Sequence, residues 1–139
     1  MDVMERLNEI GKLVVKNDFK RAMAEIWNLW EGVPEPKTCV PNAYLIIEYG
    51  VACALKLQDL DAAETWAKLA PAFSAARHES GEVEFLVGKV AYERGELEKA
   101  KDWLRRADAK SEGRMFHGED RKYIQLLGSG ITVTGATSP

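Results

Sequence analysis

The sequence predicts an all-α protein in which three antiparallel helical hairpins stack in a short superhelix and a C-terminal helix caps the array. Three stretches of the chain align with one another without gaps, at residues 17–29, 58–70 and 95–107. Apolar and small residues recur in each at the spacing of one helix face. A second apolar stretch precedes each copy, near residues 3–15, 42–57 and 81–94. Each pair of stretches therefore predicts one hairpin.

The aligned stretches share a start signal and a packing stripe. Each has an acidic residue at the predicted helix start, where a carboxylate can accept from free backbone N–H groups. The acidic residues are Asp18, Asp59 and Glu96, and the shared stripe contains Ala22, Ala63 and Ala100, then Ile26, Ala67 and Leu104, then Leu29, Ala70 and Ala107. A short alanine side chain allows two helices to approach closely. The stripe therefore predicts tightly packed helix pairs.

The connections between helices can also be placed. The tripeptides NDF, QDL and GEL predict the turns inside the three hairpins, and residues 31–41 contain three prolines that prevent helix continuation. The three shared alanines lie 41 and 37 residues apart, a period typical of stacked helical repeats. We expect one domain over residues 1–127, with repeats at about 3–31, 42–76 and 81–110.

Charged residues cluster after the third hairpin, in the stretch FHGEDRKYIQLL. A repeat array needs a final helix to cover its apolar end. The stretch predicts a capping helix at about 119–127, with Glu119 and Asp120 in its first turn and a packing face of Tyr123, Ile124 and Leu127. Residues 128–139 are uncharged and rich in Gly, Ser and Thr, which predicts a flexible tail.

Composition narrows the classes of function. The chain has 139 residues, 46% hydrophobic and 29% charged, and its net charge of −3 lacks the positive field of most nucleic-acid-binding proteins. Its longest apolar run is too short for a membrane span, and its charged N-terminal residues do not resemble a secretory signal. Two cysteines with no wider disulfide framework favour reduced thiols and a cytoplasmic protein.

Residues with catalytic or metal-binding chemistry are few. Cys39, Cys53, His78 and His117 lack the short spacings of zinc ligands, so we expect no metal, and no motif indicates a cofactor. One alternative is an acid–base pair of His117 with Glu119 or Asp120. Such a pair needs a pocket that a small helical array does not supply. The sequence therefore predicts a protein that is not an enzyme.

The third hairpin resembles a tetratricopeptide repeat over residues 87–107. The matching positions are Gly88, Tyr92, Gly95, Ala100, Leu104 and Ala107. The second copy keeps Ala63 and Ala70 but has Val51 where the family usually has glycine, and the first copy has Ile10 there. The resemblance covers roughly residues 3–110 and implies a protein-binding groove lined by the first helix of each hairpin.

The resemblance also implies which residues contact a partner. They are Leu45, Glu48, Lys56, Glu82, Phe85, Lys89, Tyr92 and Glu93, and His117 is added from the C-terminal stretch. The basic clamp by which some family members grip an acidic C-terminal tail is absent, because its positions hold Leu7, Gly11, Tyr49, Glu82 and Leu86. A chaperone adaptor of that type is therefore disfavoured.

With no effector domain in the sequence, the expected activity is occupation of a protein partner's surface. The degenerate repeats and the closing helix resemble small bacterial repeat proteins that act as toxin immunity proteins. That resemblance implies neutralisation of a cognate secreted toxin, with Glu48, Glu82 and Glu93 complementing a basic cleft. The alternative is a secretion or assembly chaperone, or a scaffold adaptor, that holds a partner segment in the groove.

Overall fold

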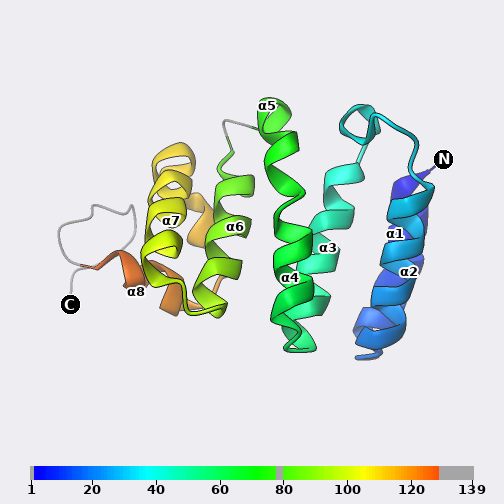
Figure 1. The fold of residues 1–139 in the computed structure, drawn as a ribbon, viewed down its shortest axis with the longest axis horizontal. Helices are drawn as coiled ribbons and strands as arrows, with labels where there is room; N and C mark the ends of the chain where they lie inside the picture. Colours follow the sequence, from blue (N-terminus) through cyan, green and yellow to red (C-terminus); the bar gives the residue numbers. More distant parts are fainter. Residues whose placement is uncertain (1, 78–79, 129–139) are drawn as a thin grey trace. The chain divides into compact units, whose positions relative to one another are not determined.

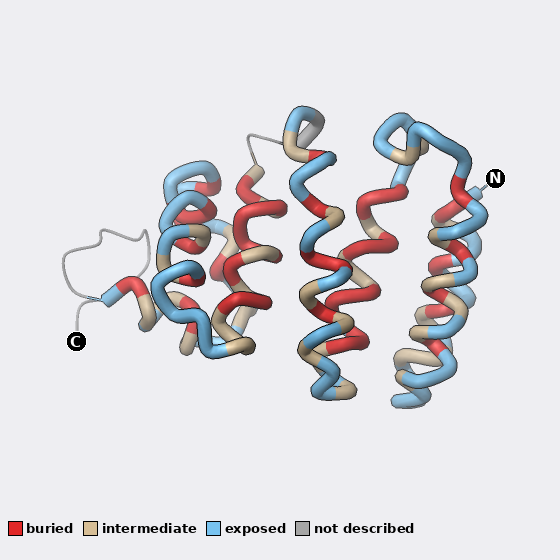
Figure 2. The backbone as a smooth tube through the Cα atoms, in the orientation of Figure 1, coloured by how far each residue is buried: buried red, intermediate tan, exposed pale blue. Residues whose placement is uncertain are grey.

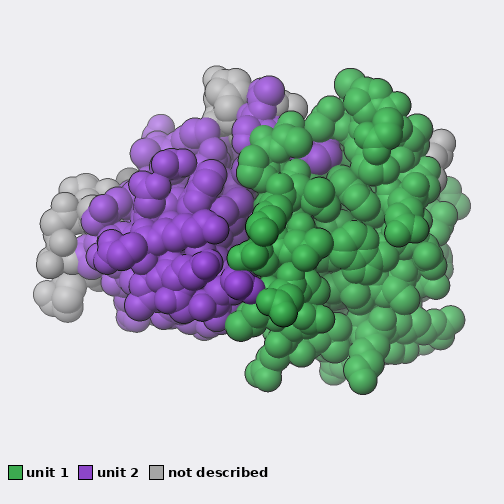
Figure 3. Space-filling view, in the orientation of Figure 1, with its two compact units in different colours: residues 1–72 green, residues 73–139 purple. Residues whose placement is uncertain are grey.

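The computed structural model describes residues 2–77 and 80–128, and every regular element in those ranges is helical (Figure 1). The prediction of an all-α protein is confirmed. The chain divides into two compact units, residues 1–72 and 73–139 (Figure 3). The single domain over residues 1–127 stays a prediction, and the tail beyond Gly128 lies outside the described residues.

The first unit consists of helices that pack against their neighbours in the sequence. Its elements are α1 (Val3–Val15), α2 (Phe19–Gly32), the 3-10 turn η1 (Lys37–Cys39), α3 (Ala43–Lys56) and α4 (Leu60–Ala67). Helix α2 packs on both α1 and α3, and α3 packs on α4. The short 3-10 turn η2 (Ala70–Phe73) spans the division between the units.

The second unit is built around one pair of helices. Its elements are α5 (Ser74–Arg77), α6 (Glu82–Glu93), α7 (Leu97–Ser111), the 3-10 turn η3 (Arg114–Phe116) and α8 (Arg121–Leu127). Helices α6 and α7 pack along each other, and η3 and α8 pack on α7. The helix bounds agree closely with the predicted stretches.

The three predicted turns have the same backbone geometry. Asn17, Gln58 and Gly95 adopt positive φ angles of 61°, 56° and 81°. In each turn the N–H of the next residue donates a 2.9 Å hydrogen bond to a carbonyl five residues earlier, in Leu13, Ala54 and Ala91 respectively. This is the Schellman arrangement that ends a helix and satisfies its last carbonyls. The repeat seen in the sequence is therefore repeated in the backbone.

The predicted helix starts are only partly confirmed. Asp59 accepts a 3.1 Å hydrogen bond from the N–H of Ala62, as an N-cap residue should. Asp18 and Glu96 occupy the same N-cap position, but their side chains accept no capping bond. At these two helices a nearby negative charge can still favour the helix N-terminus.

The shared stripe forms the core of the helix pairs (Figure 2). Its nine members, from Ala22 to Ala107, are all buried. In the first unit the core is completed by Trp66, which is fully buried, with the ring of Trp27 stacked 4.0 Å away and the ring of Trp30 edge-on at 5.8 Å. Close packing requires Gly50 here, because a Cβ at that position would lie 2.4 Å from the Trp66 ring.

Candidate functional site

The charged C-terminal stretch folds as a cap that contacts α6 and α7. Helix α8 begins at Arg121, and Asp120 is its N-cap, accepting a 3.0 Å hydrogen bond from the N–H of Lys122. The helix lies close to the predicted range of about 119–127, but Glu119 and Asp120 are not in its first turn, because Glu119 precedes the helix and Asp120 is its N-cap residue. The predicted packing face is confirmed, since Tyr123 and Leu127 are buried and Ile124 packs against their cluster.

Aromatic rings hold this cap against α6. Phe85 is 3% exposed and lies edge-on to Phe116 at 5.3 Å and to Tyr123 at 5.9 Å. Tyr92 lies edge-on to Tyr123 at 5.3 Å. Phe85 was predicted to contact a partner, and its burial contradicts that prediction because residues 114–127 of the same chain already cover it.

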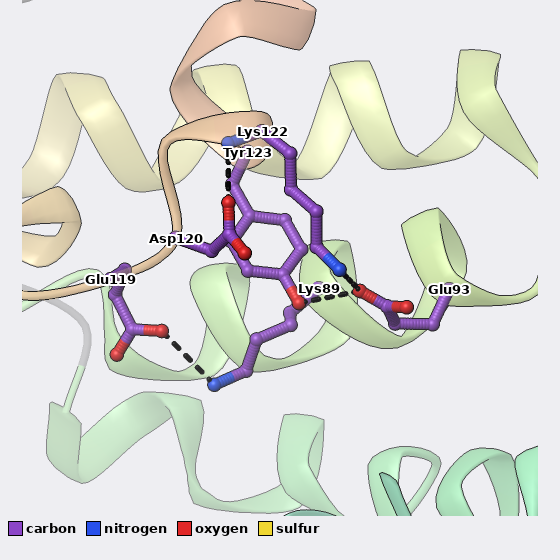
Figure 4. Close-up of polar contacts among 6 residues, drawn as sticks. All are labelled: Lys89, Glu93, Glu119, Asp120, Lys122 and Tyr123. Carbon is purple, nitrogen blue, oxygen red and sulfur yellow. Dashed lines mark hydrogen bonds and ion pairs between the residues drawn. The ribbon is translucent and has the colours of Figure 1, made fainter. Parts of the chain in front are cut away.

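One hydrogen bond and two ion pairs join α6 to residues 119–123 (Figure 4). The Tyr123 hydroxyl donates a 2.7 Å hydrogen bond to Oε2 of Glu93, and Nζ of Lys122 lies 2.7 Å from the same oxygen. Nζ of Lys89 lies 3.4 Å from Oε1 of Glu119. We call these five residues, together with Asp120, the α6–α8 polar cluster. The cluster uses the predicted contact residues Lys89 and Glu93 internally.

Two members of the polar cluster, Lys122 and Tyr123, have pKa values above their usual range. Burial, followed by the hydrogen bond to Glu93, raises the pKa of Tyr123 far above its usual range. The hydrogen bond to Glu93 also raises the pKa of Lys122 above its usual value. A catalytic acid or base works best with a pKa near the working pH. This arrangement therefore suits a structural clamp better than proton transfer.

His117 lies outside the cluster. Its side chain is exposed, just after η3, and makes no hydrogen bond or ion pair within the described part of the chain. Glu119 and Asp120, its hypothetical acid–base partners, are engaged by Lys89 and by the N-terminus of α8. The structure does not bring His117 into contact with either carboxylate. His117 remains accessible to a partner.

The other predicted contact residues lie on two helices. Leu45 and Glu48 are half-buried on α3, Lys56 is exposed at the end of α3, and Glu82 is half-buried at the start of α6. Leu45, Glu48 and Lys56 belong to the first unit, whereas Glu82 belongs to the second.

A groove lies between α1 and α3, within the first unit, and none of the individual residues predicted to contact a partner lines it. Its volume is about 450 Å³, and it is lined by Asn8, Gly11, Lys12, Val15, Lys16 and Tyr49. The sequence carried one usable signal, a glycine inside a helix with lysines one and five positions later. That signal was missed because Gly11 and Tyr49 were considered only as positions of an absent basic clamp.

The remaining reactive groups are isolated. Cys39 is exposed, whereas Cys53 is buried and burial raises its thiol pKa, which makes it a poor nucleophile. Within the described ranges no three His, Cys, Asp or Glu side chains gather as metal ligands, and His78 lies outside those ranges. In the same ranges, no helix has the length and apolar character that crossing a bilayer requires.

Comparison of the chain with protein-family models, with curated proteins and with solved structures finds no match. The resemblance to tetratricopeptide repeats stays a prediction drawn from the residues at 87–107. The α1–α3 groove, as an open and accessible surface, is the candidate functional site.

Proposed function

We propose that this chain is a non-enzymatic protein–protein interaction module of the tetratricopeptide type, with three stacked hairpins and a C-terminal cap. The equivalent turns at Asn17, Gln58 and Gly95 support the repeat, since each ends its helix with the same hydrogen bonds. The buried alanines support it further, because each lies at the corresponding position of its hairpin. Repeat arrays bind partners through the surfaces that their stacked helices leave open.

The single observation that carries the proposal is the α1–α3 groove. Family members use the first helix of each hairpin for binding, and α1 and α3 are the first helices of their hairpins. The corresponding face of α6 is covered by the chain's own residues 114–127. We therefore assign partner binding to the first unit and a capping role to the aromatic face of α6.

For the partner we propose a cognate secreted toxin, which the module would neutralise by covering its active surface. The exposed groove and Lys56, both in the first unit, would supply contacts. Glu93 is a weaker candidate than the sequence implied, because Lys122 and Tyr123 already occupy its carboxylate. A chaperone or scaffold adaptor is the second candidate, and it is favoured by the groove's suitability for an extended segment.

Affinity capture tests the proposal. The tagged chain is cross-linked in its native host lysate, and the retained proteins are identified and quantified by mass spectrometry. One folded partner at equal stoichiometry, whose toxicity is suppressed by the purified chain, would support the immunity function. Several unfolded clients would support the chaperone instead. Turnover of a small molecule by the chain alone would contradict both.

A further inference from the structure

The α6–α8 polar cluster and the ring of Tyr92 surround one ammonium group. Nζ of Lys122 lies 5.6 Å from the ring centroid of Tyr92, 5.3 Å from that of Tyr123, and 2.7 Å from Oε2 of Glu93. The two rings stand at 78° to each other, so they form two walls of a corner, and the carboxylate faces the same nitrogen (Figure 4). Aromatic faces around a cation are the arrangement by which proteins recognise alkylammonium ligands.

We infer that Tyr92, Tyr123 and Glu93 form a binding site for an alkylammonium group, which a protein partner supplies as a lysine side chain. We call these three residues the ammonium cage. Lys122 of the same chain fills the cage in the structure. The cage belongs to the second unit, whereas the α1–α3 groove belongs to the first, so this inference does not rest on the function proposed for that groove.

The cage can be vacated without unfolding the cap. The side chain of Lys122 is 37% exposed and that of Glu93 is 24% exposed, so their ion pair lies at the solvent edge of the capped face. Ion pairs at a protein surface contribute little to stability. Helix α8 is also held by the buried side chains of Tyr123 and Leu127 and by the hydrogen bond from Tyr123 to Glu93. Lys122 can therefore rotate into solvent while the rings and the carboxylate stay in place.

The charges around the cage favour a cation. The hydrogen bond to Glu93, and the negative charges of Glu93 and Asp120, raise the pKa of Lys122 against the opposing effect of burial. Lys89, the other cation of the polar cluster, is paired with Glu119 at 3.4 Å. The charges of Glu93 and Asp120 therefore remain for a partner's ammonium group when Lys122 leaves.

Other ligands fit the cage less well. An anion would meet the carboxylates of Glu93 and Asp120, and like charges repel. A metal ion needs several oxygen, nitrogen or sulfur ligands, whereas the cage offers one carboxylate that already accepts from Tyr123. A quaternary ammonium would face both rings but could not donate to Glu93. A primary ammonium can do both.

Titration of the isotope-labelled full chain with n-butylammonium chloride, followed by NMR, tests the chemistry of the cage. The ion has the length of a lysine side chain, and the variant Lys122→Ala leaves the cage empty. We expect saturable shifts at Tyr92, Glu93 and Tyr123 with a Kd of about 1–10 mM, as for a small ligand in an open site. Sodium chloride at the same ionic strength, and uncharged n-butanol, should give no saturable shift there. Failure of butylammonium to saturate by about 100 mM would overturn the proposal.

Further variants connect this binding to the cage. Glu93→Gln and Tyr92→Leu, each combined with Lys122→Ala, should raise the Kd at least about tenfold. The matched control Glu98→Gln, in the same background, removes an exposed carboxylate of α7 that is not part of the cage. The wild-type chain should bind at least about tenfold more weakly than Lys122→Ala, because its own tethered lysine competes. Equal affinity in wild type or in Glu93→Gln, or an equal loss in Glu98→Gln, would show that the ion binds elsewhere.

The fold of the variant is checked in the same spectra. Lys122→Ala should keep α8, because alanine favours helices and the side chains of Tyr123 and Leu127 stay buried. If the amide signals of α8 are lost, Lys122→Gln replaces it, since glutamine can donate to Glu93 without supplying a cation. The same order of affinities is required of that variant.

A blocked lysine, N-acetyl-lysine-methylamide, tests the source of the ammonium group. We expect it to bind Lys122→Ala within about threefold of the affinity of butylammonium, because its side chain extends beyond the blocked backbone. If it binds at least about tenfold more weakly, the cage takes a free amine, and the assignment to a partner's lysine is wrong.

Discussion

The hydroxyl of Tyr123 donates a 2.7 Å hydrogen bond to the carboxylate of Glu93, which lies 30 residues earlier in the chain. The same carboxylate oxygen also holds Nζ of Lys122 at 2.7 Å. One glutamate of α6 thus fastens two consecutive residues of α8. The C-terminal stretch contains the charged residue types that are common in active sites. This contact holds the stretch in place.

Removal of the hydroxyl should loosen the cap without removing it. Tyr123→Phe keeps the ring contacts with Phe85 and Tyr92 but deletes a hydrogen bond to a charged group, which should cost about 1.5–3 kcal/mol. Urea unfolding of Tyr123→Phe, Glu93→Gln and the double variant would measure this coupling. Strict additivity of the two single changes would show that the hydrogen bond contributes nothing.

Alkaline pH should weaken the same contact. The pKa values of Tyr123 and Lys122 are both raised from their ordinary values of 10.0 and 10.5. The unfolded chain therefore loses these protons first, so their contribution to stability is complete below about pH 10 and falls as the pH rises further. Amide hydrogen exchange in α8 would follow the loss. Tyr123→Phe should show a shallower fall over this range, and an identical pH profile would contradict the assignment.

Two glycines of the first unit should respond in opposite ways to alanine. At Gly50 the new Cβ would lie 2.4 Å from the buried Trp66 ring, so Gly50→Ala should cost about 1–3 kcal/mol through overpacking. At Gly11 the space is open, and Gly11→Ala should add about 0.5–1 kcal/mol because glycine is a poor helix former. Thermal unfolding by circular dichroism checks both changes. Similar effects at the two positions would mean that Gly50 and Trp66 are not in close contact.

Phe85 should behave as a core residue. Phe85→Ala should cost about 3–5 kcal/mol, because it leaves a cavity among Phe116, Tyr123 and Leu104. Leu97→Ala is the matched control, since Leu97 is 47% exposed and should change stability by less than about 0.5 kcal/mol. A small effect at Phe85, with an intact fold, would restore the prediction that it faces a partner.

Asp108 should destabilise the second unit at neutral pH. Asp108 is largely buried on α7, its side chain accepts no hydrogen bond within the described chain, and burial raises the pKa of its carboxyl. In the folded chain it therefore takes up a proton at higher pH than in the unfolded chain, so its contribution to stability improves as the pH falls toward 3.8. Asp108→Asn should melt at a higher temperature than wild type at pH 7, and this advantage should shrink at lower pH. An advantage that is constant across pH would contradict this sign.

The sequence did not predict which helix faces are open to a partner. The predicted contacts at Lys89, Tyr92 and Glu93 assumed that the face of α6 is open, and the capping helix was expected to cover an end of the array. Helical periodicity shows which side of α6 is apolar, but it does not show which other segment reaches that side. The contacts of Tyr123 with Glu93 and Phe85 join residues about 30 to 40 positions apart, and no local pattern encodes such a pairing.

The sequence by itself determined the helices, their turns and their buried stripes. These features depend on neighbours within a few positions, such as the residues that close the Schellman turns at Asn17, Gln58 and Gly95. Only the tertiary structure decided that Phe85 is covered and that Gly11 lies in an open groove beside Tyr49. Both outcomes depend on how side chains from separate helices pack together. They also depend on which of these side chains are buried by a segment that comes later in the sequence.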